Sequence, residues 1–191
     1  SFEPVSGSNS RGQPFDPSRG KQYEAGVKYV PKDMPVVVTA AVYQLTKDKN
    51  LTADPANQAF SIQTGEIRSR GLELEAKAAV NANINVTAAY SYTDAEYTHD
   101  TVFYGKRPAE VPRNMASLWA DYTFHETALS GLTIGAGARY IGSTVSYYKN
   151  DTSTGKKNDS FNVAGYALMD ATVKYDLARF GLPGSSVGVN V

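Results

Sequence analysis

Apolar and polar positions alternate along most of the chain. In the stretch INVTAAYSYTDAEYTHD, residues 84–100, one set of alternate positions is apolar or aromatic from Ile84 to Tyr92. The intervening set, from Asn85 to Thr93, is mostly polar. Because successive side chains of an extended strand point to opposite faces, this pattern predicts a strand with one apolar and one polar face. No stretch repeats its apolar residues with the period of a helix, so the pattern predicts an all-β protein.

The same alternation recurs in other segments and predicts about eight strands in all. The expected strands are residues 21–30, 36–46, 66–80, 84–93, 115–124, 132–142, 165–177 and 186–191. In residues 36–46 both sets of positions are apolar, so the faces of that strand stay unassigned. In the other strands the apolar face is opposed by a face of charged, hydroxyl and glycine residues.

Short and long connections between the expected strands alternate strictly along the chain. The short ones, such as PKDMP (31–35) and VNAN (80–83), read as turns. The longer polar stretches are residues 47–65, 94–114 and 143–164. This order predicts an antiparallel meander with trimmed turns at one end and elaborated loops at the other, as in outer-membrane barrels with short periplasmic turns and long external loops.

Strand length and the placement of tyrosines favour a barrel in lipid over a soluble sheet. Strands of globular proteins usually have about 5–6 residues, whereas about 9–11 are needed to cross lipid at a tilt. Most of the expected strands reach the longer length. Tyrosines also cluster near strand ends, where interfacial aromatic girdles lie. They are Tyr23, Tyr29, Tyr90, Tyr92, Tyr122, Tyr140 and Tyr175. We therefore expect the apolar face to contact lipid and the polar face to line a wet lumen.

Composition narrows the function classes. The chain has 19 basic and 19 acidic residues, so no net charge attracts it to nucleic acid. The absence of Cys excludes disulfides and thiolate chemistry within it. The mean hydropathy of -0.37 and the lack of a long apolar run argue against a transmembrane helix but are compatible with alternating transmembrane strands.

Several stretches also resemble a known family. They are GKQYEAGVKY, GEIRSRGLELEAKA, AAYSYTDAEYT, VPRNMASLWADYTF and YALMDATVKYDLARFG. Together they resemble the C-terminal barrel half of TonB-dependent outer-membrane receptors, and their sequence is most similar to that of ferrichrome-type ferric hydroxamate receptors. The resemblance covers residues 1–191.

The resemblance implies an antiparallel transmembrane β-barrel of about 22 strands, of which about eight lie in this chain. Residues 1–191 would then be a fragment of the C-terminal receptor barrel domain, with the plug and the TonB box outside them. The implied location is the bacterial outer membrane, and the implied function is TonB-dependent uptake of a ferric siderophore. We expect no enzymatic activity and no cofactor, with iron arriving only as a siderophore complex.

The resemblance also implies a set of partners. They are the ferric siderophore, the TonB energy-transducing complex acting through the missing N-terminal part, outer-membrane lipid and lipopolysaccharide, and a phage or colicin. Nucleic acid is not among them. Phage or toxin binding and the identity of the siderophore cannot be read from these loops, and ferrioxamine or coprogen-type chelates stay open as alternative substrates.

Aromatic residues in two long loops are the candidate ligand-binding residues. An iron–hydroxamate chelate is compact and partly apolar, so aromatic faces and hydroxyl donors suit it. The candidates are Tyr97, Phe103, Tyr104, Tyr147, Tyr148 and Phe161. For any one of them, loop packing or interfacial anchoring is an equally good explanation.

Paired carboxylates raise a second possibility. Glu73 and Glu75 lie two residues apart on one predicted face, beside Arg68 and Arg70, and paired carboxylates can perform acid–base chemistry. No nucleophile or pocket accompanies them in the sequence. We therefore expect lumen-facing charge that contacts the plug and the neighbouring strands.

One loop carries oxygen and imidazole groups that could ligate a metal. Asp94, Glu96, His99 and Asp100 lie close together in the sequence. Loops of this length are commonly polar, however, and the second histidine, His125, falls in a turn at the other end of the strands. We expect no metal site.

Two functions from other classes stay open on the sequence alone. A small closed barrel of about eight strands could be a structural or adhesive outer-membrane protein. A soluble all-β domain, such as a lectin-like binder or a hydrolase, would leave the long loops at one end without an explanation.

Overall fold

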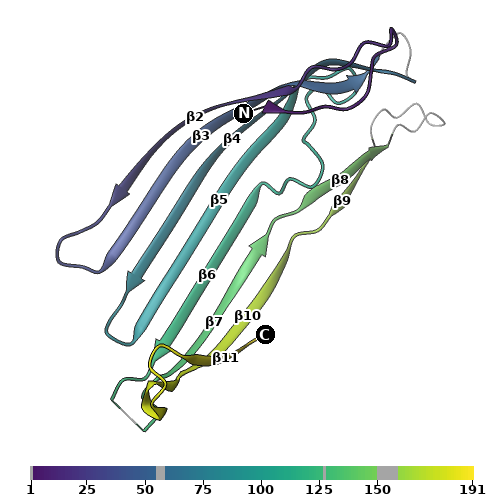
Figure 1. Ribbon diagram of the computed structural model, residues 1–191. Helices are drawn as coiled ribbons and strands as arrows, with labels where there is room; N and C mark the ends of the chain where they lie inside the picture. Colours follow the sequence, from purple (N-terminus) through teal and green to yellow (C-terminus); the bar gives the residue numbers. More distant parts are fainter. Residues whose placement is uncertain (1, 55–58, 127, 150–158) are drawn as a thin grey trace.

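The computed structural model describes residues 2–54, 59–126, 128–149 and 159–191. Its main sheet has nine strands, all antiparallel to their neighbours, in the order β1-β2-β3-β4-β5-β6-β7-β10-β11 (Figure 1). The strands are β1 Phe2–Glu3, β2 Ser18–Tyr29, β3 Val36–Ala53, β4 Ser61–Ala79, β5 Ile84–His99, β6 Asn114–Thr123, β7 Leu132–Ile141, β10 Tyr166–Asp176 and β11 Ser186–Asn190. The predicted meander of about eight long strands is confirmed, and the short β1 was not predicted.

A separate hairpin extends the sheet beyond β7 and β10. Strands β8 (Thr144–Lys149) and β9 (Asp159–Val163) pair only with each other. The ladder between β7 and β10 ends at the pair Ile141↔Tyr166, and the next paired residues are Thr144 and Val163. The hairpin leaves the sheet at Gly142, where a Cβ atom would lie only 2.7 Å from the Asn114 carbonyl oxygen. A side chain at this position would therefore clash with the first residue of β6.

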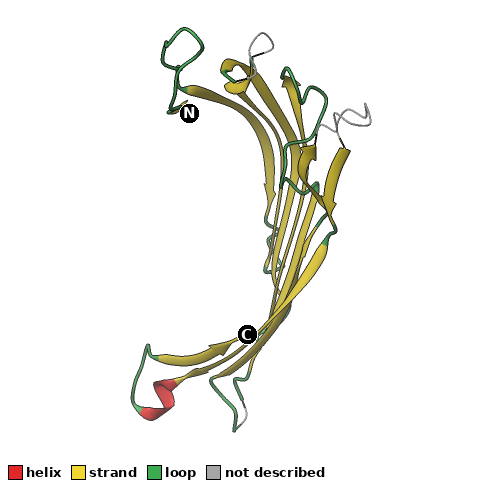
Figure 2. Ribbon diagram, turned by 90° about the vertical axis from the view of Figure 1, so that its right-hand side faces the viewer, coloured by secondary structure: helices red, strands yellow, loops and turns green. Residues whose placement is uncertain are grey.

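The sheet curves into an open arch and encloses almost no core (Figure 2). Within the part of the chain that the structure describes, Ala95 and Val145 are the only buried apolar residues. The one helical element among the described residues is a short 3-10 turn, η1 (Leu177–Phe180), capped by the Asp176 side chain. No helix among the described residues is long and apolar enough to cross a membrane.

The strand registers show which residues share a face. Side chains of directly paired residues point to the same side of a sheet, so a row of pairs can be followed across the strands. One row is entirely apolar and reads Val38–Ala76–Ala88–Leu118–Ala138–Met169. The adjacent row on the other face reads Thr39–Glu75–Ala89–Ser117–Arg139–Leu168. The predicted division into an apolar and a mostly polar face is confirmed.

The apolar face is widely exposed in this chain. Val27 is 63% exposed, Leu118 56% and Met169 87%. The predicted girdle tyrosines lie on this face as well, because each has the same strand parity as the apolar residues. A contiguous apolar surface over seven strands is far larger than water-soluble monomers expose, so it requires an apolar environment.

The long loops at one end are shorter than predicted. Residues 47–53 belong to β3, 61–65 to β4 and 94–99 to β5, and the expected loop 143–164 contains β8 and β9. These extensions are mostly polar, and their few apolar residues, such as Leu51 and Ile62, do not alternate regularly enough to be recognised as strands. Backbone pairing holds them, with register shifts on either side of Asn50, and the buried Thr52 hydroxyl bonds that of Thr101 at 2.8 Å.

The short connections at the other end are turns, as predicted, and side chains tie them to one another. The Asn83 amide donates to the Thr123 carbonyl at 2.7 Å, and the His125 imidazole lies 3.0 Å from the Ala82 carbonyl. The Arg179 guanidinium donates to the Ala128 carbonyl at 3.0 Å. Successive turns therefore form a connected rim.

Candidate functional site

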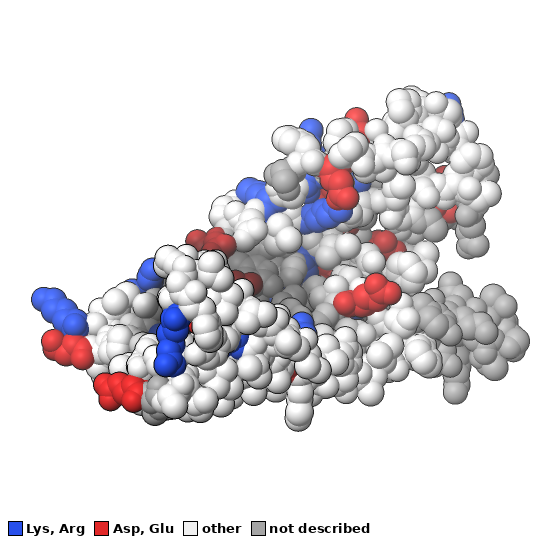
Figure 3. Space-filling view, turned by 60° about the horizontal axis from the view of Figure 1, so that its bottom comes forward, with Lys and Arg blue, Asp and Glu red and all other residues white. Residues whose placement is uncertain are grey.

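A groove of 530 Å³ runs along the polar face in the middle of the sheet. It is lined by small and apolar residues, including Ala41, Ala89 and Met115, and by the carboxylates of Glu24 and Glu73. Figure 3 shows charged side chains of both signs within the hollow of the curved sheet. The groove therefore combines an apolar floor with charged walls, a surface that suits a folded segment or a large ligand better than small-molecule chemistry.

Acidic residues dominate one side of this groove. Glu73 faces Ala41 and Ser91 across the neighbouring strands, and Glu75 is paired with the Lys77 ammonium at 2.6 Å. The Glu24 carboxylate accepts a hydrogen bond from the Gln22 amide at 2.9 Å. Among the described residues no cationic group pairs with Glu24 or Glu73. Two carboxylates in one groove thus keep their charge available for a partner.

Arg68 and Arg70 do not lie beside these glutamates, which corrects the sequence-based expectation. They share the strand parity of Leu72 and Leu74 and therefore point to the apolar side of the sheet. Period-two geometry puts residues an odd number apart on opposite faces, so closeness in the sequence was misleading here. Because the two arginines point to the other face, the glutamates form an acidic wall and no acid–base pair.

The other side of the groove is neutralised internally. The Arg139 guanidinium donates from Nε and Nη2 to the two Asp170 oxygens, each at 2.9 Å. This fork joins β7 to β10 and leaves no net charge. One side of the groove is therefore neutral, and the uncompensated negative charge lies on the other side, on β2 and β4.

Two aromatic rings lie flat along the wall over glycines of the next strand. The Trp119 ring covers Gly135 and Gly137, where added Cβ atoms would lie 2.6 Å from Cζ2 and 2.7 Å from Cε3 of that ring. The Tyr43 ring covers Gly71 in the same way, and its hydroxyl bonds that of Thr93 at 3.1 Å. The parity of β6 places Trp119 on the polar face, and the register with β7 places its ring over these glycines. The rings close the wall without projecting into the lumen.

The loop that follows β5 orders two of the candidate ligand-binding residues. The Asp100 carboxylate accepts from the backbone amides of Val102 and Phe103 at 2.8 and 2.7 Å. The turn brings the Phe103 ring to 5.6 Å from the Tyr97 ring, measured between centroids. This loop also bonds the β8–β9 hairpin, because the Glu110 amide donates to the Val145 carbonyl at 2.7 Å.

Two other aromatic candidates, Tyr104 and Phe161, are largely exposed. Tyr104 is 70% exposed and lines a polar cleft with Glu66 and Thr98 on the apolar side of β5, above the apolar rows. Phe161 is 57% exposed and is the backbone partner of Tyr147 in the β8–β9 ladder. The side chains of Tyr147 and Tyr148 lie outside what the structure describes. The six residues therefore come from one end of the strands, and the rings of Tyr97 and Phe103 are in contact.

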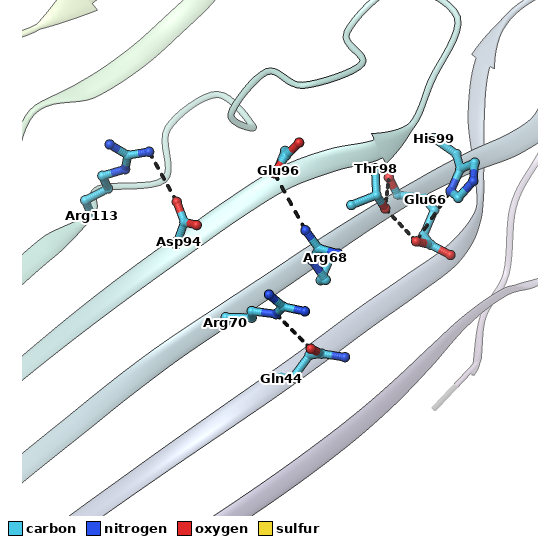
Figure 4. Close-up of polar contacts among 9 residues, drawn as sticks. All are labelled: Gln44, Glu66, Arg68, Arg70, Asp94, Glu96, Thr98, His99 and Arg113. Atoms are coloured by element: carbon cyan, nitrogen blue, oxygen red, sulfur yellow. Dashed lines mark hydrogen bonds and ion pairs between the residues drawn. The ribbon is translucent and has the colours of Figure 1, made fainter.

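Three of the residues considered above as metal ligands, Asp94, Glu96 and His99, have side-chain partners within the protein. Asp94 pairs with Arg113 at 3.2 Å, and Glu96 lies 3.7 Å from the Arg68 guanidinium (Figure 4). His99 lies 3.5 Å from the Glu66 carboxylate. Two of these partners, Arg68 and Glu66, lie on β4, and the third, Arg113, directly precedes β6.

The segment before β2 is fastened to the outer end of β3 by ion pairs. Lys47 pairs with Glu3, and Lys49 pairs with Asp16. The hydrogen bond from Lys49 holds the pKa of the Asp16 carboxyl below its ordinary value. The Asp16 backbone amide also donates to the Gln63 side-chain oxygen at 2.7 Å, which fastens the C-terminal end of the segment.

A family model described as "TonB dependent receptor-like, beta-barrel" matches residues 1–191. The chain belongs to this TonB-dependent receptor β-barrel family. It is 56% identical over 191 residues to the ferrichrome outer membrane transporter/phage receptor of Escherichia coli K12, covering all of this chain and 24% of that protein. It is 36% identical over its full length to the ferrioxamine B receptor of Salmonella typhimurium, covering 26% of that protein. The chain thus spans about a quarter of the length of these relatives.

Solved structures show the same fold. The ferripyoverdine receptor FpvA of Pseudomonas aeruginosa matches with a TM-score of 0.73 at 22% identity, over 99% of this chain and 25% of that one. The ferric-catecholate import receptor Fiu of E. coli K12 matches with a TM-score of 0.67 at 24% identity, over 92% of this chain and 25% of that one. The family is one of outer-membrane barrels, so the apolar face of the sheet faces lipid and the polar face faces the lumen.

Proposed function

We propose that this chain forms part of the barrel wall of an outer-membrane transporter for ferric hydroxamate siderophores of the ferrichrome class, with uptake energised through TonB. The observation that carries the proposal is 56% identity, over the whole chain, to a ferrichrome transporter. The protein would move its substrate without covalent chemistry. Iron would enter only inside its chelator, which needs no metal ligands from the protein.

The two-faced sheet supports this proposal physically. A lumen wide enough for an iron chelate needs a wet inner wall, and the inner rows carry Thr39, Ser117 and Arg139. The Trp119 ring lies over Gly135 and leaves the space inside the wall open. Aromatic groups at the outer end, chiefly the Tyr97–Phe103 pair, supply flat apolar surface for a neutral chelate. We propose all six aromatic candidates as contributors to the external binding surface, with the Tyr97–Phe103 pair best supported.

We further propose that a plug domain lying outside residues 1–191 occupies the groove on the inner wall. The uncompensated carboxylates of Glu24 and Glu73 suit cationic side chains from such a domain. An exposed carboxylate that gains a cationic partner away from bulk water contributes more than a surface ion pair does. The acidic side of the groove would then fix the orientation of the plug in the barrel.

The binding test uses the full-length receptor purified in detergent. Iron-loaded ferrichrome is titrated while tyrosine and tryptophan fluorescence is recorded, with iron-loaded ferrioxamine B and a catecholate chelate as controls. Saturable quenching by ferrichrome at submicromolar concentration, with far weaker responses to the controls, is the expected result. Saturable quenching by the catecholate alone would contradict the proposal.

A second substrate has specific support. The 36% identity to the ferrioxamine B receptor also covers the whole chain. In the same titration, saturation by ferrioxamine B at lower concentration than by ferrichrome would assign the receptor to linear hydroxamates. The lower identity makes this the second candidate.

A further inference from the structure

A second pocket, of 440 Å³, lies at the short-turn end of β6, β7, β10 and β11. Thr123, Thr133 and Lys174 line it, and they form one row of paired residues on the inner face of the sheet. Residues of the turns complete it, among them Ser130 and Arg179, the latter on the η1 turn at the lower end of the arch (Figure 2). Because the short turns of an outer-membrane barrel face the periplasm, this pocket lies at the periplasmic mouth of the lumen.

Two cations of this pocket keep their charge available. The Arg179 Nη1 donates to the backbone carbonyls of Ala128 and Ser130 at 3.0 and 3.4 Å, and these neutral partners hold the guanidinium without cancelling its charge. Lys174 is exposed on β10, and among the described residues no carboxylate forms an ion pair with its ammonium. A guanidinium and an ammonium that line one space suit a carboxylate, which can accept hydrogen bonds from both.

One carboxylate shares the pocket with the two cations. Asp176 lies two residues beyond Lys174 on the same side of β10, about 6.8 Å further along the strand. Its Oδ1 accepts from the Ala178 amide at 2.8 Å, which fixes the side chain at the edge of the pocket. A carboxylate has two oxygens that accept, so Asp176 can also receive a hydrogen bond from an ammonium. The pocket therefore offers partners for a carboxylate and an ammonium held close together.

The positive charge is confined to this pocket. Along the other short turns the charged residues are Lys32, Asp33 and Glu126, one cation and two carboxylates. A broad acidic surface of a folded partner would meet these carboxylates, whereas a short ligand inside the pocket meets its cations. Specific contacts between folded proteins also need about 800 Å² of surface on each partner. The pocket is therefore suited to the end of a short peptide.

We propose that this pocket binds the diamino acid of a cell-wall stem peptide, whose side chain ends in a carbon that bears both a carboxylate and an ammonium. Lys174 and Arg179 bind the carboxylate, and Asp176 accepts from the ammonium. The hydroxyls of Ser130 and Thr133 are further donors. The cell wall is favoured as the source because it lies in the periplasm below the short turns and presents many such ends on short, flexible peptides. The inference rests on the outer-membrane location of the barrel and not on the identity of the siderophore.

The test measures the binding of soluble cell-wall fragments by the full-length receptor, in detergent and without siderophore, by saturation-transfer NMR titration. The first fragment is a disaccharide with a three-residue stem peptide that ends in meso-diaminopimelate. The second is the same fragment amidated at the side-chain carboxylate of diaminopimelate, and the third is the disaccharide alone. One exposed ion pair changes affinity by up to about fivefold. The native receptor should therefore bind the first fragment about fivefold more tightly than the second, and the disaccharide more weakly than either.

Substitution of Lys174 identifies the pocket as the site. Lys174→Gln should weaken binding of the free fragment about fivefold and leave the amidated fragment unchanged, because the lysine then has no carboxylate to lose. Lys174→Arg should keep most of the affinity. The matched control, Lys28→Gln, removes the same charge from the inner face of β2 near its short-turn end, and should retain native affinity within about twofold. Heat-modifiable gel migration verifies that each variant is a folded barrel.

Four results would overturn the proposal. The first is equal affinity of the native receptor for the free and amidated fragments, and the second is an equal loss in Lys174→Gln and Lys28→Gln. The third is displacement of the fragment by an equal concentration of free diaminopimelate, which would assign the pocket to a soluble amino acid. The fourth is tighter binding of a polyglutamate peptide than of the fragment, which would assign it to an acidic protein.

Discussion

The contact between Trp119 and Gly135 gives the sharpest stability prediction. A Cβ added at Gly135 would lie 2.6 Å from Cζ2 of Trp119 and 2.9 Å from Cγ2 of Thr172. Carbon atoms in contact normally keep about 3.5–4.0 Å, so Gly135→Ala must push the indole off the wall. Overpacking of this kind destabilises by about 1–3 kcal/mol, and the reduced freedom of the unfolded chain offsets about 0.4–1 kcal/mol. We expect a net loss of about 1–2 kcal/mol.

Gly188 supplies the matched control on the same face of the sheet. A Cβ there would meet the Val173 carbonyl oxygen at 3.3 Å and no ring, so Gly188→Ala should be neutral or stabilise by up to about 1 kcal/mol. Unfolding of the full-length receptor by urea in lipid vesicles measures both. Trp119→Leu in the Gly135→Ala background should recover part of the loss, with a coupling energy of about 0.5–1.5 kcal/mol. Equal stability of the two alanine variants, or strictly additive effects in the double variant, would refute the ring-over-glycine packing.

Three further changes test other parts of the structure. Glu73→Gln should weaken the contact with the proposed plug domain and let a large antibiotic such as vancomycin inhibit growth at several-fold lower concentration. Glu126→Gln at the exposed rim should not change the sensitivity. Equal sensitivity of the two strains would count against the acidic wall. Arg139→Lys replaces a forked contact to Asp170 with a single one, and should lower the thermal unfolding temperature at low salt and lower it less at 1 M salt. Arg179→Gln frees the Ala128 carbonyl and should speed proteolysis in residues 125–131 by several-fold in spheroplasts, with the barrel still folded; unchanged cleavage would show that the rim does not depend on this contact.

The alternation of residues predicted the strands that cross lipid and, except in residues 36–46, both of their faces. It worked because lipid requires one uninterrupted apolar side, so parity alone places Leu118 outward and Trp119 inward. Beyond the lipid both faces of the sheet meet water, so the alternation disappears. The sequence therefore predicts loops where the outer parts of β3, β4 and β5 lie. The turns at the other end could be predicted because they are short and carry turn residues.

Contacts that depend on register could not be predicted from the sequence. The placement of Arg68 and Arg70 on the lipid side follows from parity, yet their nearness to Glu73 in the chain suggested one cluster. The row joining Thr123, Thr133 and Lys174 becomes visible only when three strands are aligned. The aromatic candidates were predicted from loop composition, but the turn held by Asp100, which brings the Phe103 ring to Tyr97, was not predicted.

The claim that one face of this sheet meets lipid and the other meets the lumen can be tested residue by residue in β10. Single cysteines are introduced at successive positions from Ala167 to Lys174 in a full-length receptor that has no other reactive thiol. Each is labelled in outer-membrane vesicles with a water-soluble maleimide, and separately with a fluorophore exposed to a quencher carried on lipid acyl chains. The structure predicts a period of two, with Ala167, Met169 and Ala171 quenched by lipid and Asp170, Thr172 and Lys174 reached by maleimide. Uniform labelling along the strand, or the opposite parity, would contradict the account.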